Sequence, residues 1–154
     1  MKKAVFAGTF DPPTLGHLEL IQKASILCDE LIIAISSKPT KKFIFSNQEK
    51  TEMLKIIAPQ AQIKIAPGLI ADFAKEQSAS FPIRGLRSFS DMDEEFQMAN
   101  VNRRLGSLET IFLMTGSAHT HISSTLIREI AHFKGPLHHL VPEEIEAMIR
   151  KKFA

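Results

Sequence analysis

The chain has 154 residues, a length that suits one domain of ordinary size, and we expect a single domain over residues 1–154. Hydrophobic residues make up 44% of the chain and charged residues 23%, which excludes a disordered or collagen-like protein. The formal net charge of +2 gives no broad positive field, so we expect no nucleic-acid partner, and any basic site must be local.

The cysteine content and the length of the apolar runs bear on the cellular compartment. Cys28 is the only cysteine and has no partner within the chain, which is typical of a reducing compartment. No run approaches the ~20 apolar residues that a membrane helix needs. We therefore expect a cytoplasmic protein with no membrane partner.

Short β-branched runs alternate with longer segments of helical spacing along the chain. Ser46 and Glu49 have the spacing of a capping box, in which hydroxyl and carboxylate satisfy free amides at a helix start. Pro82 cannot donate to a ladder, so its strand is the weakest. In chain order we expect a strand at 3–7, a helix at 15–27, a strand at 31–35, a helix after Ser46 to Ile57, a strand at 63–66, a helix at 70–77, a strand at 81–84, a helix at 91–105, a strand at 110–114, a helix from Ser123 or Ser124 to Phe133, and a last helix opened by Pro142.

This alternation of strand and helix indicates a parallel sheet whose crossovers are helices. We expect an α/β fold, a Rossmann-like doubly wound parallel sheet of about five strands with helices on both faces. In such sheets ligands bind beyond the carboxyl ends of the strands, where strand order reverses. Function is therefore expected in the loops that follow strands, at 8–12, 37–42, 84–87 and 115–125.

The glycine pattern narrows the nucleotide chemistry. Neither Gly-x-Gly-x-x-Gly nor Gly-x-x-x-x-Gly-Lys-Ser/Thr occurs, so a dehydrogenase or P-loop fold is unsupported. Gly8 and Thr9 follow the first strand and permit close approach of backbone amides to an anion, and His17 lies in the next helical turn. Taken alone, a histidine at such a place is more often a solvated or capping residue.

Three sequence elements together resemble one enzyme family. Gly8-Thr9-Phe10-Asp11-Pro12, followed by Thr14-Leu15-Gly16-His17, is similar to the first signature of the nucleotidyltransferase superfamily, and Ile122-Ser123-Ser124-Thr125 is similar to its second. Between them, Ile83-Arg84-Gly85-Leu86-Arg87 resembles the element that marks the phosphopantetheine adenylyltransferase family. The resemblance covers essentially the whole chain. It implies reversible transfer of the adenylyl group of ATP to 4′-phosphopantetheine, which gives dephospho-coenzyme A and pyrophosphate in coenzyme A biosynthesis.

The resemblance also assigns roles to individual residues. It implies that His17, Lys41 and Arg87 are catalytic, with His17 stabilising the transition state. The implied acceptor-binding residues are Thr9, Lys41, Ile70 and Arg84. The implied ATP-binding residues are Thr9, Phe10, His17, Gly85, Leu86, Arg87, Glu95, His119, Thr120, His121, Ile122, Ser123, Ser124 and Thr125.

These residue types suit the implied chemistry. A phosphate monoester has a second pKa of ~6, so at neutral pH it is largely a dianion and needs no general base. The site must instead align two anions that repel each other and stabilise charge on the transferred group. Mg²⁺ is expected to arrive with ATP, because no cluster of His, Asp or Glu has the spacing of a dedicated metal site. The family further implies a homohexamer, with coenzyme A as a candidate inhibitor.

Several of these assignments have alternatives. For Arg84 and Arg87 the alternative is ion pairing, with Asp91, Asp93 or Glu95 as partners. Lys38 in its polar loop is expected to be a solvated surface residue. Glu94 and His119 stand where the family usually has aromatic residues, so the resemblance does not define which side chains surround the adenine.

Rival functions are also open. The nearest is another small nucleotidyltransferase with a different phosphorylated acceptor, such as nicotinate mononucleotide or glycerol phosphate, and the run Arg84–Arg87 argues against it. A non-catalytic nucleotide-binding domain is a second rival, and the joint presence of Thr9, His17, Lys41 and Arg87 argues against it. An RNA-binding role is the weakest of the three.

Overall fold

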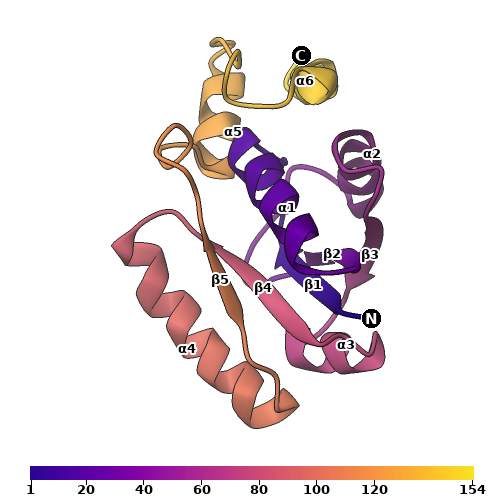
Figure 1. The fold of residues 1–154 in the computed structure, drawn as a ribbon. Coiled ribbons are helices and arrows are strands. Elements are labelled where there is room, and N and C mark those ends of the chain that lie inside the picture. Colours follow the sequence, from indigo (N-terminus) through magenta and orange to yellow (C-terminus); the bar gives the residue numbers. More distant parts are fainter.

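The computed structural model describes all residues from 1 to 154, and its centre is a five-stranded parallel sheet in the order β3-β2-β1-β4-β5 (Figure 1). The middle residues of β1 and β2 are apolar and buried, as expected for strands covered on both faces, and only their end residues include polar side chains. The strands are β1 (Lys3–Gly8), β2 (Glu30–Ser36), β3 (Gln62–Ala66), β4 (Phe81–Leu86) and β5 (Ile111–Met114).

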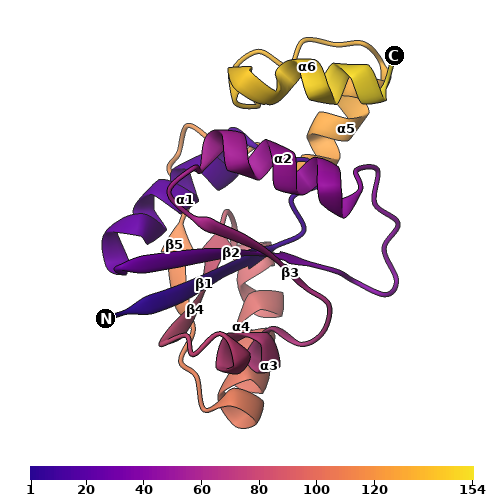
Figure 2. The ribbon, with the colours of Figure 1, turned by 90° about the vertical axis from the view of Figure 1, so that its right-hand side faces the viewer.

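Helices cover both faces of this sheet. Figure 2 shows α1 and α2 on one face and α3 and α4 on the other. Because side chains alternate along a strand, Phe6 and Ile33 pack with residues of α1 and α2, whereas Val5 and Ile32 pack with residues of α3. The predicted α/β fold with a doubly wound parallel sheet is confirmed. The helices are α1 (Leu15–Leu27), α2 (Asn47–Ile57), α3 (Ile70–Glu76), α4 (Phe89–Gly106), α5 (Ser124–His132) and α6 (Glu143–Lys152).

A third apolar cluster lies under the two C-terminal helices, which Figure 2 shows beyond the layer of α1 and α2. It joins Ile127 of α5 and Ile145 of α6 to Met53 of α2 and to Phe45 in the preceding loop. Ile122, just before α5, belongs to the same cluster. The cluster therefore fixes two loops that border the carboxyl edge of the sheet. No helix is both long enough and apolar enough to cross a membrane.

Two elements differ from the sequence-based expectation. β4 lies inside the sheet, between β1 and β5, and extends to Leu86. It tolerates Pro82 because its ladder with β5 begins only at Ile83. Helix α4 begins at Phe89, earlier than expected, because the side chain of Ser88 accepts a hydrogen bond from the backbone N–H of Asp91 and caps the helix.

Candidate active site

A cleft with a volume of about 260 Å³ opens where β1 and β4 end. Strand order reverses at β1, because β2 lies on one side of it and β4 on the other. Sheets of this kind bind ligands at that point. The predicted site residues that line the cleft are Thr9, His17, Lys41, Arg84, Gly85, Arg87, Glu95, Ile122, Ser123 and Ser124.

The start of α1 fixes the tautomer of His17. Thr14 and His17 form a capping box, in which the His17 N–H donates to Thr14 Oγ1 (3.3 Å) and the Thr14 N–H donates to His17 Nδ1 (3.0 Å). Burial, together with the charges of Arg87 and Arg84, lowers the pKa of His17 to about 4. The neutral ring accepts at Nδ1 and therefore carries its proton on Nε2, which leaves Nε2–H as a donor for an anion.

Two arginines are oriented at the cleft by ion pairs. Arg84 Nε and Nη2 donate to Glu95 at 2.7 and 2.6 Å, and its Nη1 donates to the carbonyl of Ala7. Arg87 Nε lies 3.3 Å from the carboxylate of Asp91. The structure thus brings Glu95 to the cleft as the partner of Arg84, so the ion-pairing alternative and the anion-binding interpretation involve the same side chains.

The N-terminus of α5 forms another wall of the cleft. Ser123 caps the helix by accepting the N–H of Leu126 (3.1 Å), and the Ser124 hydroxyl donates to the carbonyl of Pro12 (2.7 Å). Arg87 Nη1 reaches the carbonyl of Ile122 (3.1 Å), which ties β4 to this helix start. A capped helix start favours anions through its remaining amides, so the capping and binding roles of these serines are compatible.

The loop between β2 and α2 brings two lysines to the cleft. Lys41 and Lys38 both line it, and the Lys41 N–H donates to the Lys38 carbonyl (3.0 Å). Lys38 is exposed, as expected, but its Nζ also lies 3.6 Å from the carboxylate of Glu94 on α4. Burial and the charge of Arg128 lower the pKa of Lys41. Both sides of the cleft mouth therefore carry charged groups.

Some predicted site residues do not line the cleft. Phe10 is fully buried and packs edge-on against the ring of His17, with centroids 4.9 Å apart, so a ligand could meet only its backbone. Leu86 is buried as well. Ile70 lies at the start of α3, which follows β3 and so begins at the same edge of the sheet. The full set outside the cleft is Phe10, Ile70, Leu86, His119, Thr120, His121 and Thr125.

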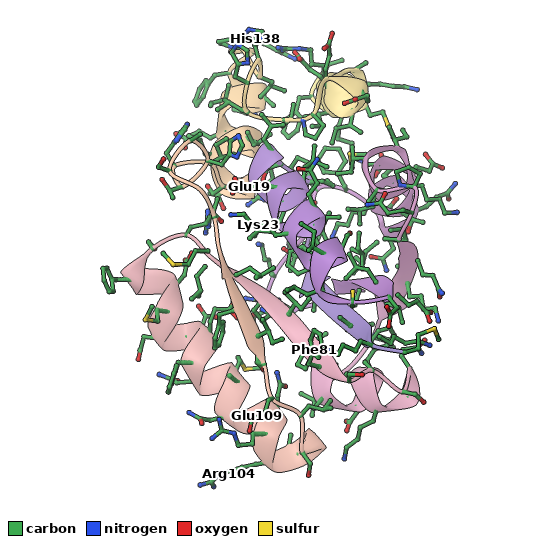
Figure 3. The ribbon with its side chains drawn as sticks, viewed as in Figure 1. Glu19, Lys23, Phe81, Arg104, Glu109 and His138 are labelled. Carbon is green, nitrogen blue, oxygen red and sulfur yellow. The ribbon has the colours of Figure 1, made fainter.

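His119 is turned toward Glu19 of α1. One carboxylate oxygen of Glu19 lies 2.6 Å from His119 Nδ1. The other oxygen accepts a hydrogen bond from the N–H of Gly116 (2.7 Å) and lies 2.6 Å from Lys23 Nζ, with which it forms an ion pair. Figure 3 shows Glu19 and Lys23 on the side of α1 that faces β5. Hydrogen bonds from Lys23 and His119 lower the pKa of Glu19 to about 2. Glu19 thus ties α1 to the loop that follows β5.

Five further polar residues line the cleft that were not assigned to the site from the sequence, namely Thr14, Ser36, Asp91, Glu94 and Thr115. Thr115 is the most informative, because its buried hydroxyl has no hydrogen-bond partner. A signal for it exists, since it directly follows β5 and so lies in one of the loops where function is expected. Asp91 was foreseen only as an ion-pair partner of an arginine, which it is for Arg87, and acidic residues in the first turn of a helix are common without a binding role.

Comparisons with known proteins agree with this geometry. The sequence profile of the cytidylyltransferase-like family matches residues 5–130. A phosphopantetheine adenylyltransferase of Clostridium botulinum is 42% identical over 156 aligned positions, which cover 99% of this chain and 95% of the relative. One from Caldanaerobacter subterraneus subsp. tengcongensis is 42% identical over 157 positions, covering 99% and 98%.

Among solved structures, the lipopolysaccharide core biosynthesis protein from Thermoplasma volcanium matches with a TM-score of 0.59 and 17% identity, over 75% of this chain and 97% of that one. At this identity the match shows a shared fold alone. The profile match and the two relatives span most or all of the chain. The chain therefore belongs to the cytidylyltransferase-like family and, within it, to the phosphopantetheine adenylyltransferases.

Proposed function

We propose that the chain transfers the adenylyl group of ATP to 4′-phosphopantetheine, forming dephospho-coenzyme A and releasing pyrophosphate. The observation that carries this proposal is the convergence of Thr9, His17, Lys41, Arg84 and Arg87 on one cleft at the carboxyl edge of the sheet. The name of the relatives, phosphopantetheine adenylyltransferase, supports the choice of acceptor.

The reaction is a direct in-line displacement. An oxygen of the acceptor phosphate forms a bond to the α-phosphorus of ATP, while the bond from the α-phosphorus to the bridging oxygen breaks and its electron pair leaves with pyrophosphate. At neutral pH the acceptor phosphate is largely a dianion, so no side chain has to remove a proton. The protein contributes alignment of the two anions and stabilisation of charge on the transferred group.

The donors of the cleft divide between the two substrates. His17 Nε2–H, Arg87 and the start of α5 meet the triphosphate, while Lys41 and Arg84 hold the acceptor phosphate. Thr9 follows β1, between these groups, and contacts both. The pantetheine arm runs toward Ile70 at the start of α3. The other nucleotide contacts stay predictions from the family, at Phe10, Gly85, Leu86, Glu95, His119, Thr120, His121, Ile122, Ser123, Ser124 and Thr125.

Mg²⁺ enters with ATP in this proposal, held mainly by phosphate oxygens, and supplies neutralisation of the triphosphate charge. The donor set of the cleft supports this. Each carboxylate that lines the cleft has a basic partner, in the pairs Arg84–Glu95, Arg87–Asp91 and Lys38–Glu94. The cleft therefore offers Mg²⁺ no set of free carboxylates, and the phosphate oxygens of the nucleotide would be its main ligands.

Pyrophosphate release from ATP with a panel of acceptors tests the proposal. We expect release with 4′-phosphopantetheine, together with dephospho-coenzyme A by chromatography, and none with pantetheine, nicotinate mononucleotide or glycerol phosphate. Equal turnover of pantetheine would contradict the proposal, because the acceptor phosphate would then not be the nucleophile. Turnover of another phosphorylated acceptor alone would reassign the substrate, and ATP binding without turnover would indicate a nucleotide-binding domain.

We also propose a homohexamer in the cytoplasm, with neither nucleic acid nor membrane as a partner and coenzyme A as a candidate inhibitor. Helix α4 supports assembly, because it exposes large apolar side chains on two sides, and clustered exposed apolar surface typically marks an interface. Light scattering at micromolar concentration should give the mass of six chains, and a monomer mass would refute the assembly. The exposed apolar residues of α4 are Phe89, Met92, Phe96, Met98, Val101 and Leu105.

A further inference from the structure

Lys50 on α2 is a buried cation that the proposed mechanism does not use. The residue is 0% exposed, and its Nζ has no hydrogen-bond partner. Burial lowers the pKa of Lys50, while the negative charge of Asp11 acts in the opposite direction. A buried polar group without a partner is costly and rare in folded proteins, so its retention here has to be explained by something it contacts.

The contact of Lys50 is the ring of Phe43, whose centroid lies 3.7 Å from Nζ. A cation over an aromatic face is attracted by the ring quadrupole, and the attraction is strongest where water is excluded. Phe43 lies just after Lys41 in the loop between β2 and α2, and Lys41 Nζ lies 5.8 Å from the same ring. Lys50 therefore holds the ring that borders Lys41, and its like charge disfavours a retreat of Lys41 toward the core.

The far end of the same loop is fixed by Asp11. Its fully buried carboxylate accepts the N–H groups of Ile44 (3.1 Å) and Phe45 (2.9 Å) and lies 3.7 Å from Arg128 Nη1. The backbone after Phe43 is thus anchored to the loop that follows β1. What remains to be fixed is the ring of Phe43 itself, and Lys50 is the group placed to do this.

We propose that Lys50 is a positioning residue, which holds the ring of Phe43 and thereby sets where Lys41 presents its ammonium group in the cleft. The consequence for activity rests on the proposed function, because it assumes that Lys41 holds the acceptor phosphate. Loss of the Lys50 charge should therefore weaken handling of 4′-phosphopantetheine and leave that of ATP nearly unchanged.

The test compares Lys50→Met, which removes the charge at similar volume, with Lys50→Arg, which keeps a cation over the ring. Lys55→Met, an exposed position on the same helix, is the matched control. We expect Lys50→Met to raise the KM for 4′-phosphopantetheine about five- to tenfold, with less than a twofold change in the KM for ATP. Lys50→Arg should recover most of this loss, and Lys55→Met should behave as wild type.

Limited trypsin digestion gives a readout that does not depend on activity. Cleavage after Lys41 or Lys42 should be faster in Lys50→Met than in wild type or Lys55→Met. A wild type that turns over no acceptor would refute the proposed function and leave this result to decide the role of Lys50. Unchanged cleavage and unchanged KM in Lys50→Met would overturn the proposal, as would an equal loss for both substrates that Lys50→Arg does not rescue.

If Lys50→Met does not fold, a second variant tests the same contact between Lys50 and Phe43. Phe43→Leu removes the ring while Lys50 stays, and it should produce the same selective loss for 4′-phosphopantetheine. Where both single variants fold, the double variant should lose no more than either alone, because each removes the same contact. Additive losses would show that the two residues act separately and would overturn the proposal.

Discussion

Acid should destabilise this protein through His17. Its pKa is about 4 in the folded chain, below the ordinary 6.5 that the unfolded chain keeps. As the pH falls below about 6.5, the unfolded state binds a proton that the folded state refuses until about pH 4, so the free energy of unfolding decreases over this window. At pH 5 the two pKa values give a loss of about 2 kcal/mol, out of a limit of about 3 kcal/mol at lower pH.

Urea unfolding at pH 7.5 and pH 5.0, in buffers without phosphate, measures this loss. His17→Gln is the reference, because a glutamine at the third helical position can still accept the N–H of Thr14 but does not titrate. Between the two pH values, wild type should lose about 2 kcal/mol more than the variant. Equal losses would refute the conclusion that the fold holds this imidazole neutral.

The same neutral ring predicts the kinetic effect of removing it. A donor whose hydrogen bond strengthens only in the transition state raises kcat without tightening ground-state binding. His17→Ala should therefore lower kcat by about 10² to 10³, with a much smaller change in the KM for ATP. Measuring kcat and the melting temperature on one preparation separates this from a structural role, which predicts a lower melting temperature with nearly normal turnover.

Three further substitutions probe the cleft and the contact between α1 and the loop after β5. Arg87→Lys cannot reproduce the planar fork, so the KM for ATP should rise about tenfold or more with an unchanged melting temperature, and unchanged ATP kinetics would leave Arg87 a structural role only. Gly85→Ala would place a Cβ 2.2 Å from Leu20 Cδ1, and calorimetry should show a melting temperature several degrees lower, for a cost of about 1–3 kcal/mol as Leu20 shifts. Glu19, with a pKa of about 2, contributes stability that is present above about pH 4.5 and lost toward pH 2, about 1 kcal/mol after solvent screening. The difference in unfolding free energy between wild type and Glu19→Gln should therefore shrink from pH 7 to pH 3, and a constant difference would contradict the depressed pKa.

The fold was predictable because its signals are local. Short continuous apolar runs, separated by helical segments, mark strands that are buried on both faces. The capping box from Ser46 to Glu49 is also present in the structure, as the sequence predicts. The sequence led us to expect too weak a strand around Pro82. The cost of the missing N–H of Pro82 depends on where the ladder with β5 begins, and that register is set by residues far along the chain. The start of α4 at Phe89 was missed for a different reason, because the local cap by Ser88 was not recognised in the sequence.

The candidate site was predictable only where loops follow strands. Thr9, Lys41 and Arg84 meet in one cleft because parallel strands place their carboxyl ends at the same edge. The sequence could not choose the partner of Arg84 among three nearby carboxylates, since that choice depends on the packing of α4 against β4. Nor could it place His119, whose partner Glu19 lies 100 residues away along the chain.

The position of β1 between β2 and β4 also governs the order in which the chain can become functional. We expect β1 to pair first with β2, which follows it closely in the chain, because its other edge pairs with the more distant β4, where Ala4 lies opposite Phe81. A nascent chain that ends before β4 therefore exposes an apolar strand edge, which is a template for aggregation. Closing this distant contact costs chain entropy, so we expect it to limit the rate of folding. Because Arg84 and Arg87 lie on β4 and just after it, we expect the nucleotide site to be complete only after β4 has paired.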